Sequence, residues 1–177
     1  MAPVTRWLSG EELGAEVERL TPGASARVTA TACYIEPGKL LAAATALRDD
    51  PATDLKHLTS LCGADYWDRL EVVYHIQSFE RNQIATLKVD LPDRENPTLP
   101  SVVPVWHGAW MQECEAYDLF GIVFEGHPNL HRILLWEGYP GYPLRKDFLS
   151  MPGGLQPGLA DFHGTTPREE PPVRRVE

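Results

Sequence analysis

The sequence predicts an α+β fold: an N-terminal helix-on-antiparallel-sheet domain, followed by a helix and a long extended, Pro/Gly-rich C-terminal tail. Three observations support this prediction. Two runs of β-branched and aromatic residues flank a short polar connection, a Leu- and Ala-rich segment has helical periodicity, and Pro and Gly recur after Pro92. A strand, a helix and an antiparallel hairpin in one domain favour a helical layer on one face of a sheet.

The first predicted elements lie between residues 27 and 49. Residues 27–35 are rich in Val, Thr, Tyr and Ile and predict one strand, and Glu36-Pro37-Gly38 predicts a turn. Residues 39–49 predict an amphipathic helix that ends before Pro51. The apolar face of this helix is formed by Leu40, Ala43, Ala44 and Leu47.

A β-hairpin is predicted next. Residues 69–79 and 83–91 have the composition of strands, and the connection Glu80-Arg81-Asn82 is short and polar. Residues 55–65 precede this hairpin, and no helix or strand is predicted for them.

The composition of the sequence changes after Pro92, where Pro and Gly become frequent. Three prolines interrupt residues 93–104, and residues 107–120 then have the pattern of a helix. Beyond Gly126, Pro and Gly recur every few residues, although apolar side chains are spread from Phe124 to Phe148. Such a segment buries too little apolar surface to pack on itself, so we expect these side chains to find their core on another chain.

The chain therefore divides into four predicted units. These units are the α+β domain (1–92), a linker (93–104), a helix with a partner-binding segment (105–150) and an extended tail (151–177).

Composition restricts the class of partner. A hydrophobic fraction of 43% and a formal net charge of −9 are typical of a soluble globular protein and argue against binding to nucleic acid or anionic membranes. No run of 18 apolar residues suggests a membrane span, and residues 1–10 lack a secretory signal. Cys33, Cys62 and Cys114 are far apart, without a CxxC pair, so we expect neither disulfides nor an iron–sulfur or zinc site.

The densest group of polar residues spans 113–121 and continues through His127 to His131. One interpretation is a metal-dependent hydrolase built on Glu113, Glu115, Asp118 and His127, with Glu115 and Asp118 on one helix face. Pro128 argues against a helical His127–His131 pair, and nucleophile-elbow, phosphate-loop and dinucleotide motifs are missing. The other interpretation is structural, with the carboxylates paired to Arg132, Arg145 or arginines of a partner.

Two motifs make the chain resemble a known family. Residues 113–135, ECEAYDLFGIVFEGHPNLHRILL, and residues 141–148, GYPLRKDF, resemble the signature of the NuoC-like 30 kDa subunit of proton-translocating NADH:quinone oxidoreductase, respiratory complex I. The approach Gly63-Ala64-Asp65-Tyr66 also resembles that family. Three residues depart from the pattern: Cys114 and Tyr142 stand where the family usually has Arg and His, and His131 stands at a usually basic position.

The resemblance implies a subunit without a cofactor of its own, with FMN and iron–sulfur clusters in partner subunits. It implies packing against the D-like, B-like and I-like subunits of the peripheral arm, on the cytoplasmic side of the cell inner membrane, with membrane contact only through the complex. The complex would couple electron transfer from NADH to quinone with proton translocation. The equivalent subunit of a membrane-bound hydrogenase-type complex remains an alternative.

No catalytic, cofactor-binding or metal-binding residue is assigned to this chain. The resemblance instead implies a subunit interface made by Glu113, Glu115, Tyr117, Asp118, Phe120, His127, Arg132, Arg145, Lys146 and Asp147.

Overall fold

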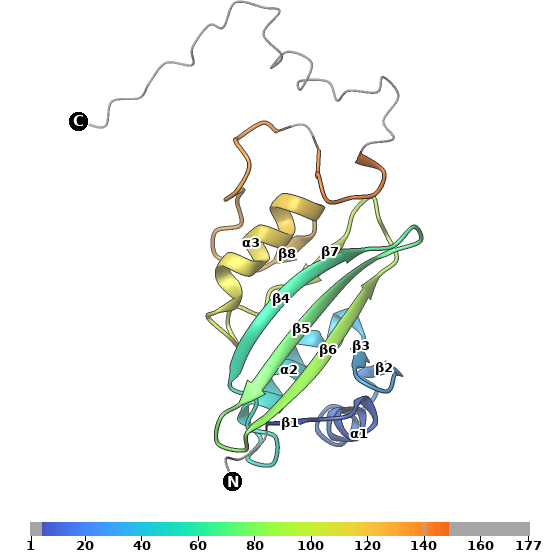
Figure 1. Cartoon of the computed structure of the whole chain (residues 1–177), viewed down its shortest axis with the longest axis vertical. Helices are drawn as coiled ribbons and strands as arrows, with labels where there is room; N and C mark the ends of the chain where they lie inside the picture. The colour runs from blue at the N-terminus through green and yellow to red at the C-terminus, as the bar shows by residue number, and fades with distance from the viewer. Residues whose placement is uncertain (1–4, 140, 149–177) are drawn as a thin grey trace, which may run out of the picture.

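A computed structural model describes residues 5–139 and 141–148 (Figure 1). A six-stranded sheet has the order β2-β3-β6-β5-β4, with β1 also paired to β6, and β7 and β8 form a second, two-stranded sheet. The helices and strands are β1 (Arg6–Trp7), α1 (Gly10–Leu20), β2 (Ser25–Val28), β3 (Cys33–Ile35), a 3₁₀ turn (Pro37–Lys39), α2 (Leu40–Asp49), β4 (His57–Asp65), β5 (Leu70–Ser78), β6 (Gln83–Leu91), β7 (Thr98–Pro100), α3 (Ala109–Phe120) and β8 (Val123–Glu125). The α+β class is confirmed.

The predicted hairpin is the centre of the sheet. Strands β5 and β6 pair antiparallel along their whole length, and Asn82 takes a left-handed conformation (φ 48°) in the turn between them. Side chains alternate across the two faces of a strand, so every second residue of β5 faces the core. These core residues are Leu70, Val72, Tyr74 and Ile76.

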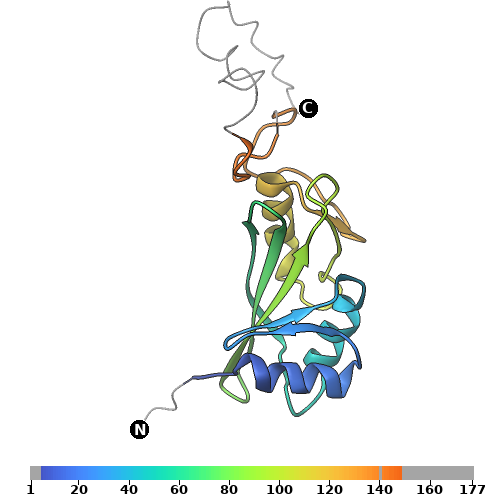
Figure 2. The ribbon, with the colours of Figure 1, turned by 90° about the vertical axis from the view of Figure 1, so that its right-hand side faces the viewer.

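The predicted helix at 39–49 is confirmed as α2. All four residues of its predicted apolar face, Leu40, Ala43, Ala44 and Leu47, are buried. Helix α1 packs beside α2 and was not predicted; Ser9 and Glu12 form a capping box at its start. In Figure 2 both helices lie on one side of the long strands.

Two details of the predicted sheet were wrong. Residues 27–35 do not form one strand, because the chain reverses after Val28 and pairs β2 antiparallel with β3. The backbone N–H of Thr29 donates to the Ala32 carbonyl at 2.9 Å and closes this turn. The sheet is also mixed rather than antiparallel, since β1 and β3 both run parallel to β6. A crossover connection such as the one containing α2 permits parallel pairing.

Within the described residues, four strands formed where none was predicted: β1, β4, β7 and β8. Strand β4 pairs antiparallel with β5 from His57 to Asp65. Strand β7 lies inside the predicted linker and pairs parallel with β8, and the residues after it, from Ser101 to Val103, are buried. The four-unit division stays a prediction, and its last unit, 151–177, lies outside the described residues.

The segment after α3 packs on this chain. Ile122 and Phe124 belong to the hydrophobic core, and Phe148 is 8% exposed. The expectation that the apolar residues of this segment find their core on another chain was therefore wrong for Phe124 and Phe148. No helix in the described ranges is long and apolar enough to cross a membrane.

Candidate functional site

Helix α3 carries the start of the first signature motif and lies along β4, the edge strand of the main sheet. Its C-terminus is set by Gly121, whose left-handed conformation (φ 73°) ends the helix. The side-chain oxygen of Gln112 accepts a hydrogen bond from the backbone N–H of Leu61 in β4. The helix thereby covers part of a strand edge that would otherwise be open to pairing with another chain.

Asp118 is the most tightly bound side chain of α3. Its carboxylate is fully buried and accepts hydrogen bonds from Arg132 Nη1 (2.9 Å) and from the backbone N–H groups of Ile133 (3.1 Å), Leu134 (2.7 Å) and Leu135 (2.9 Å). Burial acts to raise its pKa, but these backbone donors and the guanidinium outweigh burial, so the pKa of Asp118 is lowered. Asp118 is therefore an ionised anchor for the loop that follows β8.

Arg132 extends this anchor to the second motif. Its guanidinium also donates to the carbonyls of Asp118 (3.1 Å), Tyr139 (3.4 Å) and Gly141 (3.1 Å). The ring of Tyr142 lies between two arginines, with its centroid 5.2 Å from the Arg132 guanidinium carbon and 5.0 Å from that of Arg145. The aromatic residue at the usual histidine position thus contacts both guanidinium groups by cation–π interactions.

Arg145 fastens the second motif to the end of α3. Its Nε donates to the Phe120 carbonyl at 2.6 Å, where the helix leaves carbonyl groups unpaired, and its Nη1 donates to the Arg94 carbonyl at 2.9 Å. Backbone bonds reinforce this position, since the N–H of Leu144 donates to the Leu119 carbonyl at 3.2 Å.

Lys146 and Asp147 continue the attachment toward the sheet. The backbone N–H of Lys146 donates to the Asp65 carboxylate at 2.6 Å, and Asp147 lies 3.5 Å from the Arg94 guanidinium. Arg94 also pairs with Asp65. The Lys146 ammonium lies 5.5 Å from the ring of the exposed Trp67. Asp65 and Arg94 were not predicted as site residues, although Asp65 lies in the Gly63-Ala64-Asp65-Tyr66 segment that resembles the family. Arg94 lies in no recognised motif, so the sequence gave no signal for it.

Glu113 occupies a different environment on the same helix. It is fully buried and accepts hydrogen bonds from the Ser101 hydroxyl (2.7 Å) and the Val102 N–H (2.7 Å), and no cation pairs with it in the described part of the chain. Burial raises its pKa to about 7, against the opposing effect of both hydrogen bonds. The buried hydroxyl of Tyr74 has no hydrogen-bond partner among the described residues.

His127 and Cys114 are held together beneath the loop. His127 Nδ1 accepts a hydrogen bond from the Asn129 N–H (3.0 Å), so the ring proton lies on Nε2, which donates to the Trp110 carbonyl (3.1 Å). Cys114 Sγ is 3.8 Å from Nε2 and 3.6 Å from the Asn129 carbonyl. Both ring nitrogens are engaged within the fold.

The geometry separates the residues of the hydrolase interpretation. Glu115 and Asp118 are three residues apart on helix α3, but Glu115 is exposed whereas Asp118 is fully buried, so the two carboxylates do not form a common site. Glu113 and His127 each have their own partners elsewhere. Within residues 5–139 and 141–148, no group of three or more His, Cys, Asp or Glu side chains is placed to hold a metal ion.

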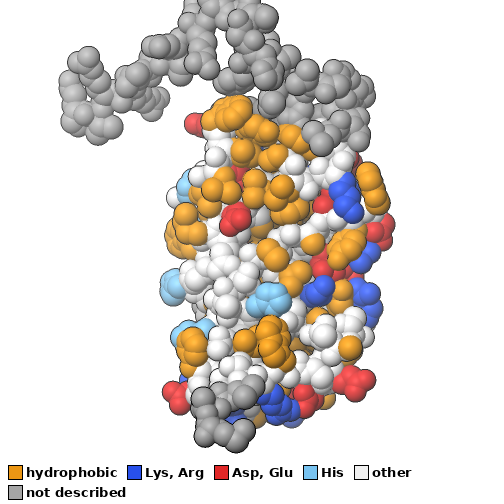
Figure 3. All heavy atoms as spheres, in the orientation of Figure 1, with side chains coloured by type: hydrophobic (Ala, Val, Ile, Leu, Met, Phe, Trp, Pro, Cys, Tyr) orange, Lys and Arg blue, Asp and Glu red, His pale blue; other side chains and the backbone are white. Residues whose placement is uncertain are grey.

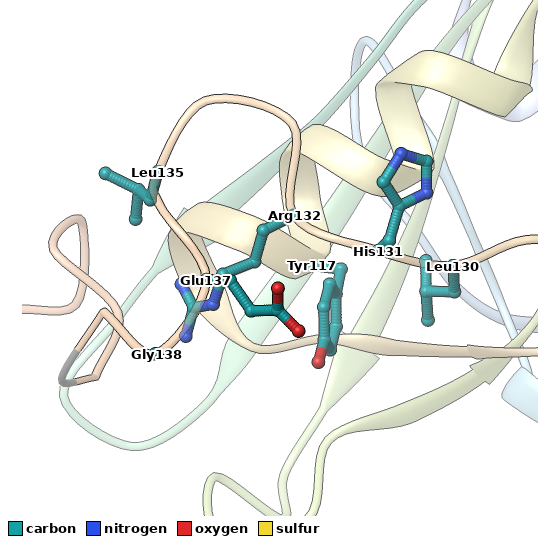
Figure 4. Close-up of a pocket in the computed structure, with 7 residues that line it drawn as sticks. All are labelled: Tyr117, Leu130, His131, Arg132, Leu135, Glu137 and Gly138. Carbon is teal, nitrogen blue, oxygen red and sulfur yellow. The ribbon is translucent and has the colours of Figure 1, made fainter. Parts of the chain in front are cut away.

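A pocket opens between α3 and the loop that Asp118 anchors (Figure 4). Its volume is about 510 Å³, and it is lined by Tyr117, Leu130, His131, Arg132, Leu135, Glu137 and Gly138. Apolar side chains gather at this end of the molecule (Figure 3). Exposed apolar residues of the two motifs are Val123 (41%), Leu134 (60%) and Leu144 (53%), and Met111 (56%) is exposed just before the first motif.

Comparison with known proteins assigns the family. The model of the 30 kDa subunit of respiratory-chain NADH dehydrogenase matches residues 33–152. The chain belongs to this family. The matched region begins at β3 and includes α3, the Asp118 anchor and the GYPLRKDF motif.

Relatives of this 30 kDa subunit family support the assignment. The NADH-quinone oxidoreductase C subunit of Roseiflexus sp. is 46% identical over 117 residues, which cover 64% of this chain and 67% of that protein. The C subunit of Burkholderia multivorans is 41% identical over 145 residues, covering 77% of this chain and 70% of that protein. The match spans only 54% of the C subunit from Azorhizobium caulinodans.

A solved structure shares the fold. A chain of the membrane-bound sulfane sulfur reductase, an archaeal respiratory membrane complex, matches with a TM-score of 0.64 and covers 94% of this chain and 99% of that one. Its sequence identity is 21%, so this likeness concerns the fold alone.

Proposed function

We propose that this chain is a cofactor-free scaffold subunit in the peripheral arm of NADH:quinone oxidoreductase. It supports electron transfer from NADH to quinone, coupled to proton translocation, while FMN and the iron–sulfur clusters reside in partner subunits. Its partners are D-like, B-like and I-like subunits, and it lies on the cytoplasmic side of the cell inner membrane.

The Asp118 anchor is the observation that carries this proposal. Signature residues Asp118, Arg132 and Arg145 bind one another's loops and backbone instead of converging on an open reaction centre. A carboxylate with a guanidinium and three backbone donors is poorly suited to take up a proton, because its charged form is strongly favoured. The same contacts fix the position of the exposed apolar side chains Leu134 and Leu144.

The role of the interface residues follows from this geometry. Glu115, Lys146 and Asp147 have exposed side chains and remain candidates for direct contact with a partner. Asp118 and Arg132 act indirectly: their ion pair holds the loop after β8, and that loop carries the surface that would contact the partner.

The test separates assembly from catalysis. Asp118→Ala and Arg145→Ala, each expressed in place of the native subunit, should lower the amount of assembled complex on native gels. NADH:quinone activity per assembled complex should stay near normal, because neither residue meets substrate in this proposal. Glu125→Ala, at an exposed acid of β8, is the matched control and should assemble normally. Normal abundance with activity reduced a hundredfold would refute the scaffold role.

A further inference from the structure

Glu137 is an acid that the described fold does not use. Its side chain is exposed, and it forms no hydrogen bond or ion pair within residues 5–139 and 141–148. It nevertheless lines the 510 Å³ pocket, and Figure 4 shows its carboxylate directed toward the side chain of Tyr117. Asp118, the neighbouring acid, has four donors of its own.

The charges around the pocket leave Glu137 uncompensated. Arg132 also lines the pocket, but its charge is matched by Asp118, from which it lies 2.9 Å away. His131 Nδ1 lies 2.8 Å from the Asn129 carbonyl and donates to it, so this ring nitrogen is already engaged. The Glu137 carboxylate therefore has no counter-charge among the described residues, and the pocket favours a cation.

The walls of the pocket select among cations. Leu130 and Leu135 line the pocket and offer apolar surface to an aliphatic stem. Tyr117 offers an aromatic ring beside the Glu137 carboxylate. An arginine side chain matches all three features, because its stem packs on apolar groups, its planar head stacks on aromatic rings, and it binds carboxylates through two parallel hydrogen bonds. A volume of about 510 Å³ also admits the residues that flank such an arginine.

We propose that this pocket receives an arginine side chain presented by a partner protein. The identity of the partner as a component of the oxidoreductase rests on the proposed function, whereas the preference of the pocket for arginine does not. Insertion would place the Glu137 carboxylate against the guanidinium and would bury the exposed part of Tyr117.

The preference for arginine is tested on the isolated full-length chain with a small probe. N-acetyl-arginine amide, titrated by NMR, should shift the resonances of Tyr117, Leu130, Leu135 and Glu137 in a saturable manner. Glu137→Gln should weaken this binding on the order of tenfold, and Glu125→Gln should leave it unchanged. Equal or stronger shifts with N-acetyl-glutamate amide, or no saturable shift with the arginine probe, would overturn the proposal.

The partner is tested in the assembled complex. Glu137→Lys should reduce the amount of this chain retained in the washed complex at least about tenfold, whereas Glu125→Lys should not. The melting temperature of the isolated Glu137→Lys chain should equal that of the wild type. A lower melting temperature would identify the occupant as a segment of this chain and would overturn the proposal.

The experiments distinguish failure of the arginine-pocket proposal from failure of the scaffold role. If Glu137→Lys is retained normally while Asp118→Ala is lost from the complex, the arginine pocket is refuted and the scaffold role stands. If both variants assemble normally but Asp118→Ala lacks turnover, the scaffold role itself fails.

Discussion

Asp118 in α3 and Arg132 in the following loop form a buried ion pair with an N–O distance of 2.9 Å. The aspartate is fully buried and the arginine side chain is 17% exposed. Three backbone N–H groups complete the shell of the carboxylate, so the pair fixes a whole loop rather than a single contact.

Removing this carboxylate should destabilise the chain strongly. Asp118→Ala leaves the Arg132 guanidinium without a counter-charge and three backbone donors unpaired, and breaking a buried pair costs roughly 3–5 kcal/mol. The free energy of unfolding, measured by urea denaturation at pH 7, should fall by that amount. Glu115→Ala changes an exposed acid on the same helix and should alter it by less than about 0.5 kcal/mol. Equal stabilities of the two variants would contradict the conclusion that Asp118 is a buried anchor of the fold.

The contribution of Asp118 should disappear in acid. Its pKa is lowered in the folded chain, so its stabilisation is present above the unfolded value of about 3.9 and is lost as the pH falls through the folded value. The stability difference between wild type and Asp118→Asn should therefore shrink below about pH 4. A difference that does not change between pH 7 and pH 3 would show that the pair is not electrostatic.

Glu113 should have the opposite pH dependence. Its pKa is raised from 4.5 to about 7, so the folded chain holds a proton that the unfolded chain has released, and stability falls as the pH rises through this window. Glu113→Gln has no proton to lose at this position, so its stability should not fall over this pH range. Its stability relative to the wild type should rise by about 1.4 kcal/mol per pH unit between roughly pH 5 and 7, then level off. Urea denaturation across pH 5–8.5 measures this slope, and a pH-independent difference would rule it out.

Comparing alanine variants of two glycines distinguishes the cost of backbone strain from the cost of a steric clash. Gly121 and Gly126 both have left-handed backbone (φ 73° and 81°), which costs about 1 kcal/mol for alanine. At Gly121 an added methyl would also meet the Tyr142 ring at 2.4 Å, whereas nothing lies within 4 Å at Gly126. Gly121→Ala should therefore lower the free energy of unfolding by at least about twice as much as Gly126→Ala. Equal losses would mean that Tyr142 moves aside without cost.

Restoring the usual family residue at position 114 should harm this chain. Cys114 is fully buried beside His127, and no acid is bonded to it within the described ranges. Cys114→Arg would bury an unpaired charge and should cost roughly 3 kcal/mol or more. Cys114→Ser keeps the size and a donor for the Asn129 carbonyl, so its cost should be about 1 kcal/mol. Thermal unfolding of both variants provides the comparison, and an Arg variant as stable as wild type would reveal an unrecognised partner.

The sequence alone determined those parts of the fold whose pattern is local. Helix α2, the β5–β6 hairpin and helix α3 were predicted because periodicity, turn residues and Pro51 are all encoded within a few neighbouring positions. The two signature motifs also identified the family, which the match to residues 33–152 confirms.

The tertiary structure decided what depends on distant parts of the chain. Strand β4 has no clear alternation and forms because β5 offers a partner, and β3 became parallel to β6 only through the crossover that contains α2. Glu115 and Asp118 are three residues apart, and no local rule shows that one is exposed while four donors bury the other. Those donors come from a loop about fifteen residues later, so burial and pairing, unlike periodicity, arise only when remote segments meet.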